Sequence, residues 1–424
     1  MKTNAFNIKA GFTACFFHFI LFMGISLHAA GQSGTDYIPV VSGVQYQWIG
    51  TYNLDKLNKI LKDELKEFLS ASTMGSVAFN DSFPPAKNAV KLYRVKYNSV
   101  IPEFANMPTV ASGLVAVPEN GSDSMPMIMY QHGTVFSKTE VPSFPDNSEE
   151  TKIMIARFAS QGYIVIGADY FGRGISDLPD SYLVNNSTQQ ACVDMLLAVK
   201  DVLSAWKIKT GHFFISGWSQ GGWATMTFLH KLESLGIQVT AAATASAPTD
   251  IYIIMDRWFN NYQPIDAVYL PACISLQIQA QEYYHQQVGL TASAVRPEYL
   301  QAARDFYNGK MDYTSFYKAT PQKLQDFLKP EFMASGNTGD SPYWQTLEKS
   351  QAYRWRSHTP VKNYYGGSDE VVPTFIAKLP QEFHKVLGCG PTTAVYAGDK
   401  ADHRATFIYA VLHQKKWFDE FLKK

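Results

Sequence analysis

From about residue 127 onward, the chain alternates between short apolar runs and longer amphipathic patterns. The amphipathic patterns place apolar residues three to four positions apart, which is typical of helices that pack on one face. The short runs suit strands that are covered on both faces. The expected strands are Met127–Gln131, Tyr163–Ala168, Phe213–Ser216, Val239–Ala245, Val361–Tyr365 and Thr392–Tyr396, and the expected helices are Glu149–Ser160, Thr188–Trp206, Gln220–Leu235, Thr374–Leu387 and Arg404–Leu422. This alternation predicts an α/β fold with a mostly parallel sheet flanked by helices.

Two further patterns precede this series. Leucine, isoleucine and phenylalanine recur at helical spacing between Leu54 and Leu69, so we expect a helix there that packs against the main fold. Val90–Val100 and Thr109–Val117 are rich in strand-forming residues and are joined by a loop containing proline, which predicts an antiparallel start to the sheet. We therefore predict an N-terminal helical arm over residues 32–85 and an α/β core over residues 86–250 and 358–424.

The alternation stops between residues 251 and 357. No convincing strand occurs there, and helical patterns such as Pro297–Tyr307 and Pro321–Leu328 dominate a stretch that is rich in aromatic residues. We expect a helical cap inserted after Val239–Ala245, the sixth strand counted from Val90. The alternative is that these aromatic side chains form the core of a second small domain.

The first 31 residues have the pattern of a secretory signal peptide. Lys2 and Lys9 precede the apolar run Ala10–Leu27, and the small residues Ala29, Ala30 and Gly31 follow it. An uncleaved membrane anchor is the alternative, although the run is at the short limit for a membrane span. We expect a secreted or periplasmic protein with no membrane anchor after cleavage.

Composition excludes several other classes of protein. Apolar residues make up 46% of the 424 residues, which is ample for a packed core. The 37 Lys and Arg balance the 37 Asp and Glu, which does not favour a nucleic-acid partner. Cys192, Cys273 and Cys389 remain after signal cleavage and allow one disulfide at most. The sequence contains no CxxC, HExxH or EF-hand motif, so we expect no dedicated metal site.

The strongest chemical motif is the GxSxG sequence from Gly217 to Gly221, centred on Ser219. It follows the strand Phe213–Ser216 directly and precedes the helix that begins near Gln220. A serine on such a turn is presented at the carboxyl end of the sheet and at the N-terminus of a helix, where negative charge is favoured. Ser219 is therefore the candidate nucleophile.

A serine hydroxyl needs a base, and the base needs an orienting carboxylate. Asp369 is the best acid, because it lies in the turn after the strand Val361–Tyr365; Glu370 is next to it and is expected to point elsewhere. His403 follows the strand Thr392–Tyr396 in a loop at the start of the last helix, where it can reach Ser219. His384 and His413 lie within helical patterns and are interpreted as structural.

The oxyanion of an acyl-transfer intermediate needs two N–H donors. One is expected from Gln220, the residue after the nucleophile. The second is expected from the loop after Met127–Gln131, which reads His132-Gly133-Thr134, and we choose the backbone of Thr134. His132 is interpreted mainly as a structural histidine that braces this loop.

The order Ser219, Asp369, His403, with an HG loop upstream and a helical insertion before the acid, resembles the α/β-hydrolase superfamily over nearly all of the mature chain. The segment Ala168–Asp177, which reads ADYFGRGISD, and the tripeptide Ser181-Tyr182-Leu183 further resemble the secreted lipase and esterase branch of fungi and bacteria. Arg173 and Ser181 depart from the commoner residues of that branch. The resemblance implies a carboxylic-ester hydrolase that works without a cofactor.

Two other functions are possible for a chain with these motifs. A peptidase of the prolyl-oligopeptidase kind shares the catalytic core but carries a β-propeller, and the sequence shows no such array of short strands. A non-catalytic binding protein could reuse the fold. The expected partner is a small-molecule or lipid ester. The acyl chain, the alcohol and the oligomeric state are not predicted, and simple esters, triacylglycerols and acylated polysaccharides all stay open as substrates.

Overall fold

The computed structural model describes residues 36–70, 83–337 and 339–423, and the predicted signal peptide lies outside these residues. One ten-stranded sheet runs through the described chain, in the order β1-β2-β3-β4-β6-β5-β7-β8-β9-β10. The strands are β1 (Ile38–Val41), β2 (Val44–Tyr52), β3 (Val90–Ile101), β4 (Met107–Pro118), β5 (Ser124–Gln131), β6 (Ile164–Ala168), β7 (Lys209–Trp218), β8 (Ala241–Ala245), β9 (Val361–Tyr365) and β10 (Thr392–Tyr396). Neighbours from β1 to β4 and the pair β4–β6 are antiparallel. The remaining pairs are parallel, as the alternating pattern predicts.

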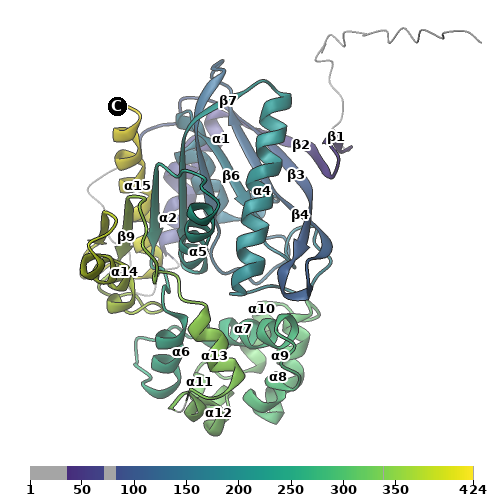
Figure 1. Cartoon of the computed structure of the whole chain (residues 1–424), viewed down its shortest axis with the longest axis vertical. Coiled ribbons are helices and arrows are strands. Elements are labelled where there is room, and N and C mark those ends of the chain that lie inside the picture. Colours follow the sequence, from purple (N-terminus) through teal and green to yellow (C-terminus); the bar gives the residue numbers. More distant parts are fainter. Residues whose placement is uncertain (1–35, 71–82, 338, 424) are drawn as a thin grey trace, which may run out of the picture. The chain divides into compact units, whose positions relative to one another are not determined.

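Helices cover both faces of the sheet (Figure 1). One face carries α4 (Asn185–Ala205), α5 (Gln220–Ser234) and α14 (Thr374–Leu387), and the other carries α1 (Leu54–Lys59), the π-helix η1 (Ile60–Glu64), α2 (Leu65–Ser70), α3 (Glu149–Arg157) and α15 (His403–Phe421). Short 3-10 turns are η2 (Pro102–Phe104), η3 (Pro145–Asn147) and η4 (Ala159–Gln161). Two hydrophobic clusters result, one on each face, because β5, β6, β7 and β8 bury residues on both sides.

The described elements between β8 and β9 are helices, with one isolated bridge between Val295 and Leu328. They are α6 (Ile251–Asn260), α7 (Leu270–Tyr284), α8 (Leu290–Ala294), η5 (Pro297–Tyr299), α9 (Leu300–Tyr307), α10 (Tyr313–Ala319), α11 (Leu324–Phe327), α12 (Pro330–Ala334), η6 (Ser335–Asn337) and α13 (Pro342–Lys349). We call them the helical insertion. They gather at one end of the sheet, and their aromatic side chains belong to the same hydrophobic cluster as α4 and α5 (Figure 1).

The N-terminal segment differs from its prediction. Residues 38–52 form strands β1 and β2 rather than part of a helical arm, and only the segment from Leu54 onward is helical. The reason is the alternation of Val44, Tyr46 and Trp48 with glutamines, because alternate residues of a strand face the same side of a sheet. β2 pairs antiparallel with β3 along its whole length, with one register shift between Trp48 and Gly50. Strands β1 and β2 make the strand before the insertion the eighth in chain order, and counted from β3, which begins at Val90, it is still the sixth.

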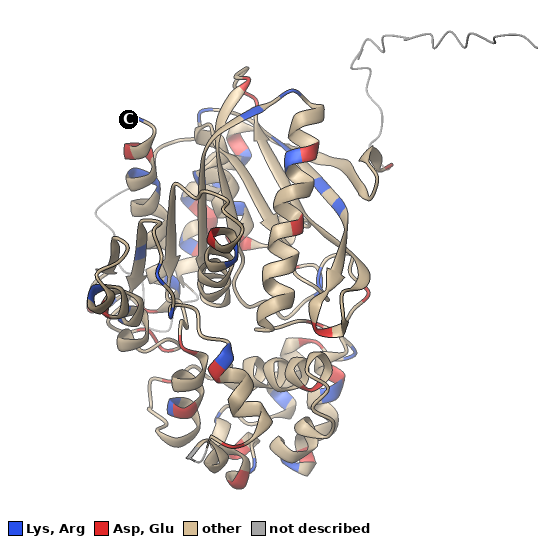
Figure 2. Ribbon diagram, in the orientation of Figure 1, with Lys and Arg blue, Asp and Glu red and all other residues tan. Residues whose placement is uncertain are grey.

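Basic and acidic side chains are interspersed over the sheet, its flanking helices and the helical insertion (Figure 2). Among the described helices, none is long and apolar enough to cross a membrane. Cys192, Cys273 and Cys389 are free thiols in the described chain, and Cys192 and Cys273 are buried. The fold therefore depends on packing on the two faces of the sheet.

Candidate active site

Ser219 is the single residue between the end of β7 and the start of α5, at a sharp turn. Its backbone has φ 57° and ψ −126°, a conformation that side-chain-bearing residues rarely adopt. The turn is held because the Ser219 N–H donates to the carbonyl of Ala245 at 2.9 Å, at the end of the adjacent strand β8. The serine is thereby lifted above the carboxyl end of the parallel sheet, as the motif predicts.

The two glycines of the motif are required by close backbone contacts. A Cβ on Gly217 would lie 2.1 Å from the carbonyl oxygen of Gly221, and a Cβ on Gly221 would lie 1.9 Å from the carbonyl oxygen of Gln131. Both distances are far below van der Waals contact. The turn can therefore form only where these positions carry no side chain.

Asp369 and His403 meet at the carboxyl ends of β9 and β10. The Nδ1 atom of His403 lies 2.9 Å from Oδ1 of Asp369, which also accepts the backbone N–H groups of Val371 and Val372 at 3.0 and 2.8 Å. The side chains of Asp369 and His403 are only 1% and 5% exposed. This arrangement leaves Nε2 of His403 as the atom available to a hydroxyl.

His403 is the first residue of α15, directly after Asp402. The Asp402 carboxylate caps the helix by accepting the N–H of Ala405 at 2.8 Å. Trp218, which precedes the nucleophile, donates from Nε1 to the His403 carbonyl at 3.1 Å and packs its ring 4.9 Å from the imidazole. Trp218 thus fixes the position of His403 in two ways, by a hydrogen bond to its backbone carbonyl and by packing against its ring.

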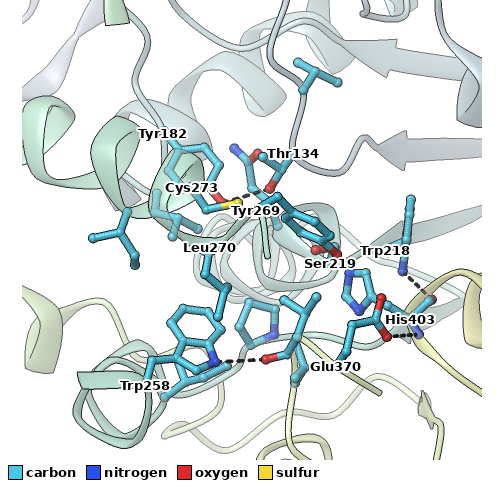
Figure 3. A pocket seen from close by; sticks show the side chains of 18 of the residues that line it. Thr134, Tyr182, Trp218, Ser219, Trp258, Tyr269, Leu270, Cys273, Glu370 and His403 are labelled. Carbon is cyan, nitrogen blue, oxygen red and sulfur yellow. Dashed lines mark hydrogen bonds between the residues drawn. The ribbon is translucent and has the colours of Figure 1, made fainter. Parts of the chain in front are cut away.

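Ser219 and His403 line the same pocket and point toward one another in Figure 3. An imidazole held at Nδ1 by a carboxylate can accept a proton from a hydroxyl at Nε2. The structure therefore places Ser219 and His403 at one pocket, with Asp369 hydrogen-bonded to the far side of the His403 ring.

The charges around His403 shift the pKa of both His403 and Asp369. Burial alone lowers the pKa of His403, but the carboxylate of Asp369, with smaller effects from Glu370 and Asp402, raises that pKa above the usual value of an imidazole. Burial conversely raises the pKa of Asp369, and the charge and hydrogen bond of His403 outweigh it, so the pKa of Asp369 lies below its usual value. The buried pair therefore favours an ionised aspartate.

Glu370 does not point away from the site, contrary to the prediction. Its Oε2 atom accepts the backbone N–H of His403 at 3.0 Å, and its carboxylate lines the pocket (Figure 3). The side chain is buried, and burial raises the pKa of Glu370, an effect that Asp369 increases and His403 opposes. A side chain at this turn can reach the start of α15 because β9 and β10 are adjacent parallel strands.

The other two downstream histidines make structural contacts. His384 in α14 places Nδ1 2.7 Å from the Thr392 hydroxyl and Nε2 3.0 Å from the Trp355 carbonyl, so both ring nitrogens are occupied. His413 lies inside α15 and packs against the ring of Tyr409 at 4.1 Å. Neither lines the pocket of Ser219.

Thr134 and Gln220, the two predicted oxyanion donors, both line the pocket beside Ser219. Gln220 is the first residue of α5, so its N–H has no partner within that helix. The N–H of Thr134 has no acceptor among the described residues, and its hydroxyl lies 2.8 Å from that of Tyr182. Both predicted donors therefore lie at the pocket of Ser219.

The loop of Thr134 is held by residues that sequence reasoning missed. Glu150 in α3 accepts the N–H of Gly133 at 3.0 Å and also the hydroxyl of Tyr130. Tyr170, two residues after β6, stacks on His132 with ring centroids 4.3 Å apart and donates its hydroxyl to the His132 carbonyl. Burial lowers the pKa of His132 to about 4, so this ring stays neutral and acts as the predicted brace.

Arg173, which departs from the pattern of the lipase branch, supports the same loop. Its Nη2 atom donates to the Val135 carbonyl at 2.9 Å and forms a buried ion pair with Asp180 at 2.6 Å. Gly174 next to it has φ 61°, and a Cβ there would lie 2.1 Å from the Asp169 carboxylate. The segment after β6 is therefore a packed support for the loop after β5.

The pocket above Ser219 has a volume of about 380 Å³. Its apolar side comes mainly from α6 and α7 of the helical insertion, including Ile254, Trp258 and Ile274, and the core contributes Trp218 and Val372. Polar groups converge near the serine from the loop after β5 and from α15. Within the described residues, no group of three or more His, Cys, Asp and Glu could hold a metal ion.

No protein-family model and no curated protein sequence matches the chain. Solved structures do match it. A putative hydrolase from Legionella pneumophila is 22% identical, with a TM-score of 0.75 over 89% of this chain and 97% of that chain. The rice cell wall degrading esterase LipA from Xanthomonas oryzae is 20% identical, with a TM-score of 0.73 over 88% of this chain and 95% of that chain.

This chain has the α/β-hydrolase fold. Candida antarctica lipase A also matches, at 14% identity and a TM-score of 0.57 over 74% of this chain and 73% of that chain. The resemblance to lipases and esterases that the sequence indicates is therefore found in the structure as well. At these identities the matches show the α/β-hydrolase fold alone, and the chemistry depends on the residues around Ser219.

Proposed function

We propose that the protein is a secreted serine esterase or lipase that cleaves carboxylic esters through an acyl-enzyme. The hydrogen bond between His403 and Asp369, in the pocket that holds Ser219 on its strained turn, carries this proposal. The fold shared with LipA and with lipase A adds support. The order of the three residues in the chain is also the order found in α/β hydrolases.

In the proposed mechanism, the Ser219 hydroxyl attacks the ester carbonyl while Nε2 of His403 takes its proton. The N–H groups of Thr134 and Gln220 stabilise the resulting oxyanion. His403 then returns the proton to the leaving alcohol, and the C–O bond breaks to give an acyl-enzyme. Water, deprotonated by His403, releases the acid and restores Ser219, while Asp369 holds the imidazole in the required tautomer throughout.

A fluorophosphonate probe with a fluorescent tag tests the assignment of Ser219. Wild-type protein should be labelled and should hydrolyse p-nitrophenyl butyrate, whereas Ser219→Ala should lose labelling and about 10³ or more of its turnover. Ser234→Ala, at the exposed end of the same helix, is the matched control and should behave as the wild type. Full turnover by a folded Ser219→Ala protein would exclude the mechanism.

The peptidase alternative receives no support from the described chain, because its named strands all belong to the one ten-stranded sheet and none forms a propeller blade. The alcohol of the substrate is the open question. One structural neighbour is a rice cell wall degrading esterase and another is a lipase, so acylated polysaccharide and triacylglycerol belong in the same assay panel as simple esters.

Secretion is proposed from the N-terminal pattern, which lies outside the described residues. Sequencing the N-terminus of the protein recovered from the medium or periplasm tests it directly. A new N-terminus near residue 32 supports cleavage, and retention of Met1 in a membrane fraction contradicts it.

A further inference from the structure

A second cavity lies beside the loop after β5 and shares one lining residue with the active-site pocket. This cavity has a volume of about 300 Å³ and lies between the segment Gly172–Asp180 and helices α7 and α9 of the insertion. Phe136 is the one residue that lines both the second cavity and the pocket of Ser219. The Phe136 side chain therefore lies where the two cavities approach one another, and we call it the partition.

The ring of Phe136 is held firmly in this position. It stacks on Tyr313 of α10 with centroids 4.5 Å apart and planes 11° from parallel, and it contacts Phe306 of α9 at 5.7 Å. The backbone N–H of Phe136 donates to the Glu140 carboxylate at 3.2 Å. Arg173 anchors the preceding carbonyl of Val135. The partition is thus a stack of aromatic rings between a braced core loop and the insertion.

The side of the pocket that ends at Phe136 is the side away from His403. Figure 3 shows Thr134, Tyr182 and Cys273 on the opposite side of Ser219 from His403 and Glu370. Phe136 follows Thr134 by two residues, and its stacking partner Tyr313 lines the same pocket as Cys273. The partition therefore belongs to the side of Thr134.

The positions of His403 and Thr134 on opposite sides of Ser219 indicate where the alcohol and the acyl chain of a bound ester would lie. The leaving alcohol must accept a proton from His403, so it lies on the side of His403 and Glu370. The two substituents of the carbonyl carbon point in different directions, and the acyl chain then extends toward Tyr182, Cys273 and Phe136. An apolar chain on this side meets the Phe136 ring before it can enter the second cavity.

We propose that Phe136 limits the length of the acyl chain, so that the protein acts on esters of short and medium-chain acids and excludes long ones. The inference rests on the proposed function and deepens it by naming the acyl class. Removal of the Phe136 ring would extend the pocket toward the second cavity. Leu178, Leu276 and Phe306 give a longer chain apolar contacts there, beside the Arg173–Asp180 ion pair.

Initial rates on p-nitrophenyl esters from acetate to palmitate test the proposal. Wild-type kcat/KM should fall beyond medium chain lengths, and Phe136→Ala should raise the ratio of palmitate to butyrate at least about tenfold, since each further buried methylene contributes about fourfold. Phe136→Leu, which keeps much of the packing, should shift the ratio in the same direction by less. It also serves as the test should Phe136→Ala fail to fold.

A substitution in the second cavity provides the matched control. Leu178 lines the second cavity and not the pocket of Ser219. Leu178→Trp alone should therefore leave the chain-length profile unchanged, and Phe136→Ala/Leu178→Trp should lose the gain. Thermal melts confirm that each variant is folded. An unchanged profile in an active Phe136→Ala enzyme would overturn this proposal and leave the esterase standing. Absence of labelling and of turnover in the wild type would instead overturn the proposed function.

Discussion

The Oε2 atom of Glu150 accepts the backbone N–H of Gly133 at 3.0 Å, directly behind the loop that carries Thr134. A Cβ at position 133 would lie 2.8 Å from Oε1 of Glu150 and 3.2 Å from the carbonyl of Trp218, so the loop packs against both. Burial raises the pKa of Glu150 to about 7, although its hydrogen bonds from Tyr130 and Gly133 oppose this. The Gly133 N–H is thus occupied by Glu150, and in the proposed mechanism the next N–H along the chain, that of Thr134, binds the oxyanion.

Glu150→Ala should therefore lower kcat by up to about 10²-fold with a smaller change in KM, because the oxyanion donor loses its support. Glu150→Gln keeps an oxygen that can accept the Gly133 N–H and should retain most of the activity. Steady-state kinetics and the rate of inactivation by a phosphonate ester, which mimics the oxyanion, measure the effect. A loss of thermal stability with unchanged kcat would show that Glu150 serves only the fold.

The two adjacent carboxylates after β9 should differ sharply in their importance. Asp369→Asn presents an amide to Nδ1 of His403 and favours the wrong tautomer, so turnover should fall by about 10⁴. Glu370→Gln still accepts the His403 N–H and should retain turnover near the wild-type value at alkaline pH. Kinetics at saturating ester distinguish the two, and a larger loss for Glu370→Gln would mean that the acid has been assigned to the wrong residue.

The sequence predicted some elements to the residue. The bounds expected for Val361–Tyr365, Thr374–Leu387 and Thr392–Tyr396 agree with β9, α14 and β10 at both ends. Glycine and proline stand at most of these boundaries, and they break regular structure for reasons that are local to the chain. Strands β1 and β2 were missed although Val44, Tyr46 and Trp48 alternate with polar residues, which is a strand signal in its own right.

The candidate site likewise contains residues that the sequence could predict and residues that it could not. Ser219, Asp369 and His403 could be selected because each stands at a boundary between a strand and a turn or helix, where local patterns are informative. Glu150 could not be selected in this way. An acidic residue in the first turn of α3 is expected from the helix dipole alone, and nothing local shows that its side chain turns inward toward Gly133. Phe136 likewise gains its role from cavities that form only when the insertion packs on the core.

The glycines of the serine turn should be essential for folding. Gly217→Ala places a Cβ 2.1 Å from the Gly221 carbonyl oxygen, so the free energy of unfolding should fall by at least about 2 kcal/mol. Gly211 is on the same strand, and a Cβ there would meet nothing within 4 Å, so Gly211→Ala is the matched control and should change stability by less than about 0.5 kcal/mol. Urea unfolding of the two variants decides the matter, and equal stabilities would contradict the close packing of this turn.

The pH dependence of turnover should reflect the charges around His403. A general base must be neutral to accept the serine proton, and Asp369, Glu370 and Asp402 raise the pKa of His403 against the effect of burial. Turnover should therefore rise with pH, and the midpoint of kcat/KM should lie above the usual imidazole pKa of about 6.5.

Glu370→Gln removes one of these charges without removing the acceptor of the His403 N–H, so the midpoint should move to lower pH. Glu331→Gln, which removes an exposed carboxylate from α12 of the insertion, is the matched control and should leave the midpoint in place. Profiles of kcat/KM against pH for the three proteins measure the shift. A midpoint that stays fixed or rises in Glu370→Gln would mean that the Glu370 carboxylate does not act on the charge of the imidazole, and that its role is limited to holding the start of α15.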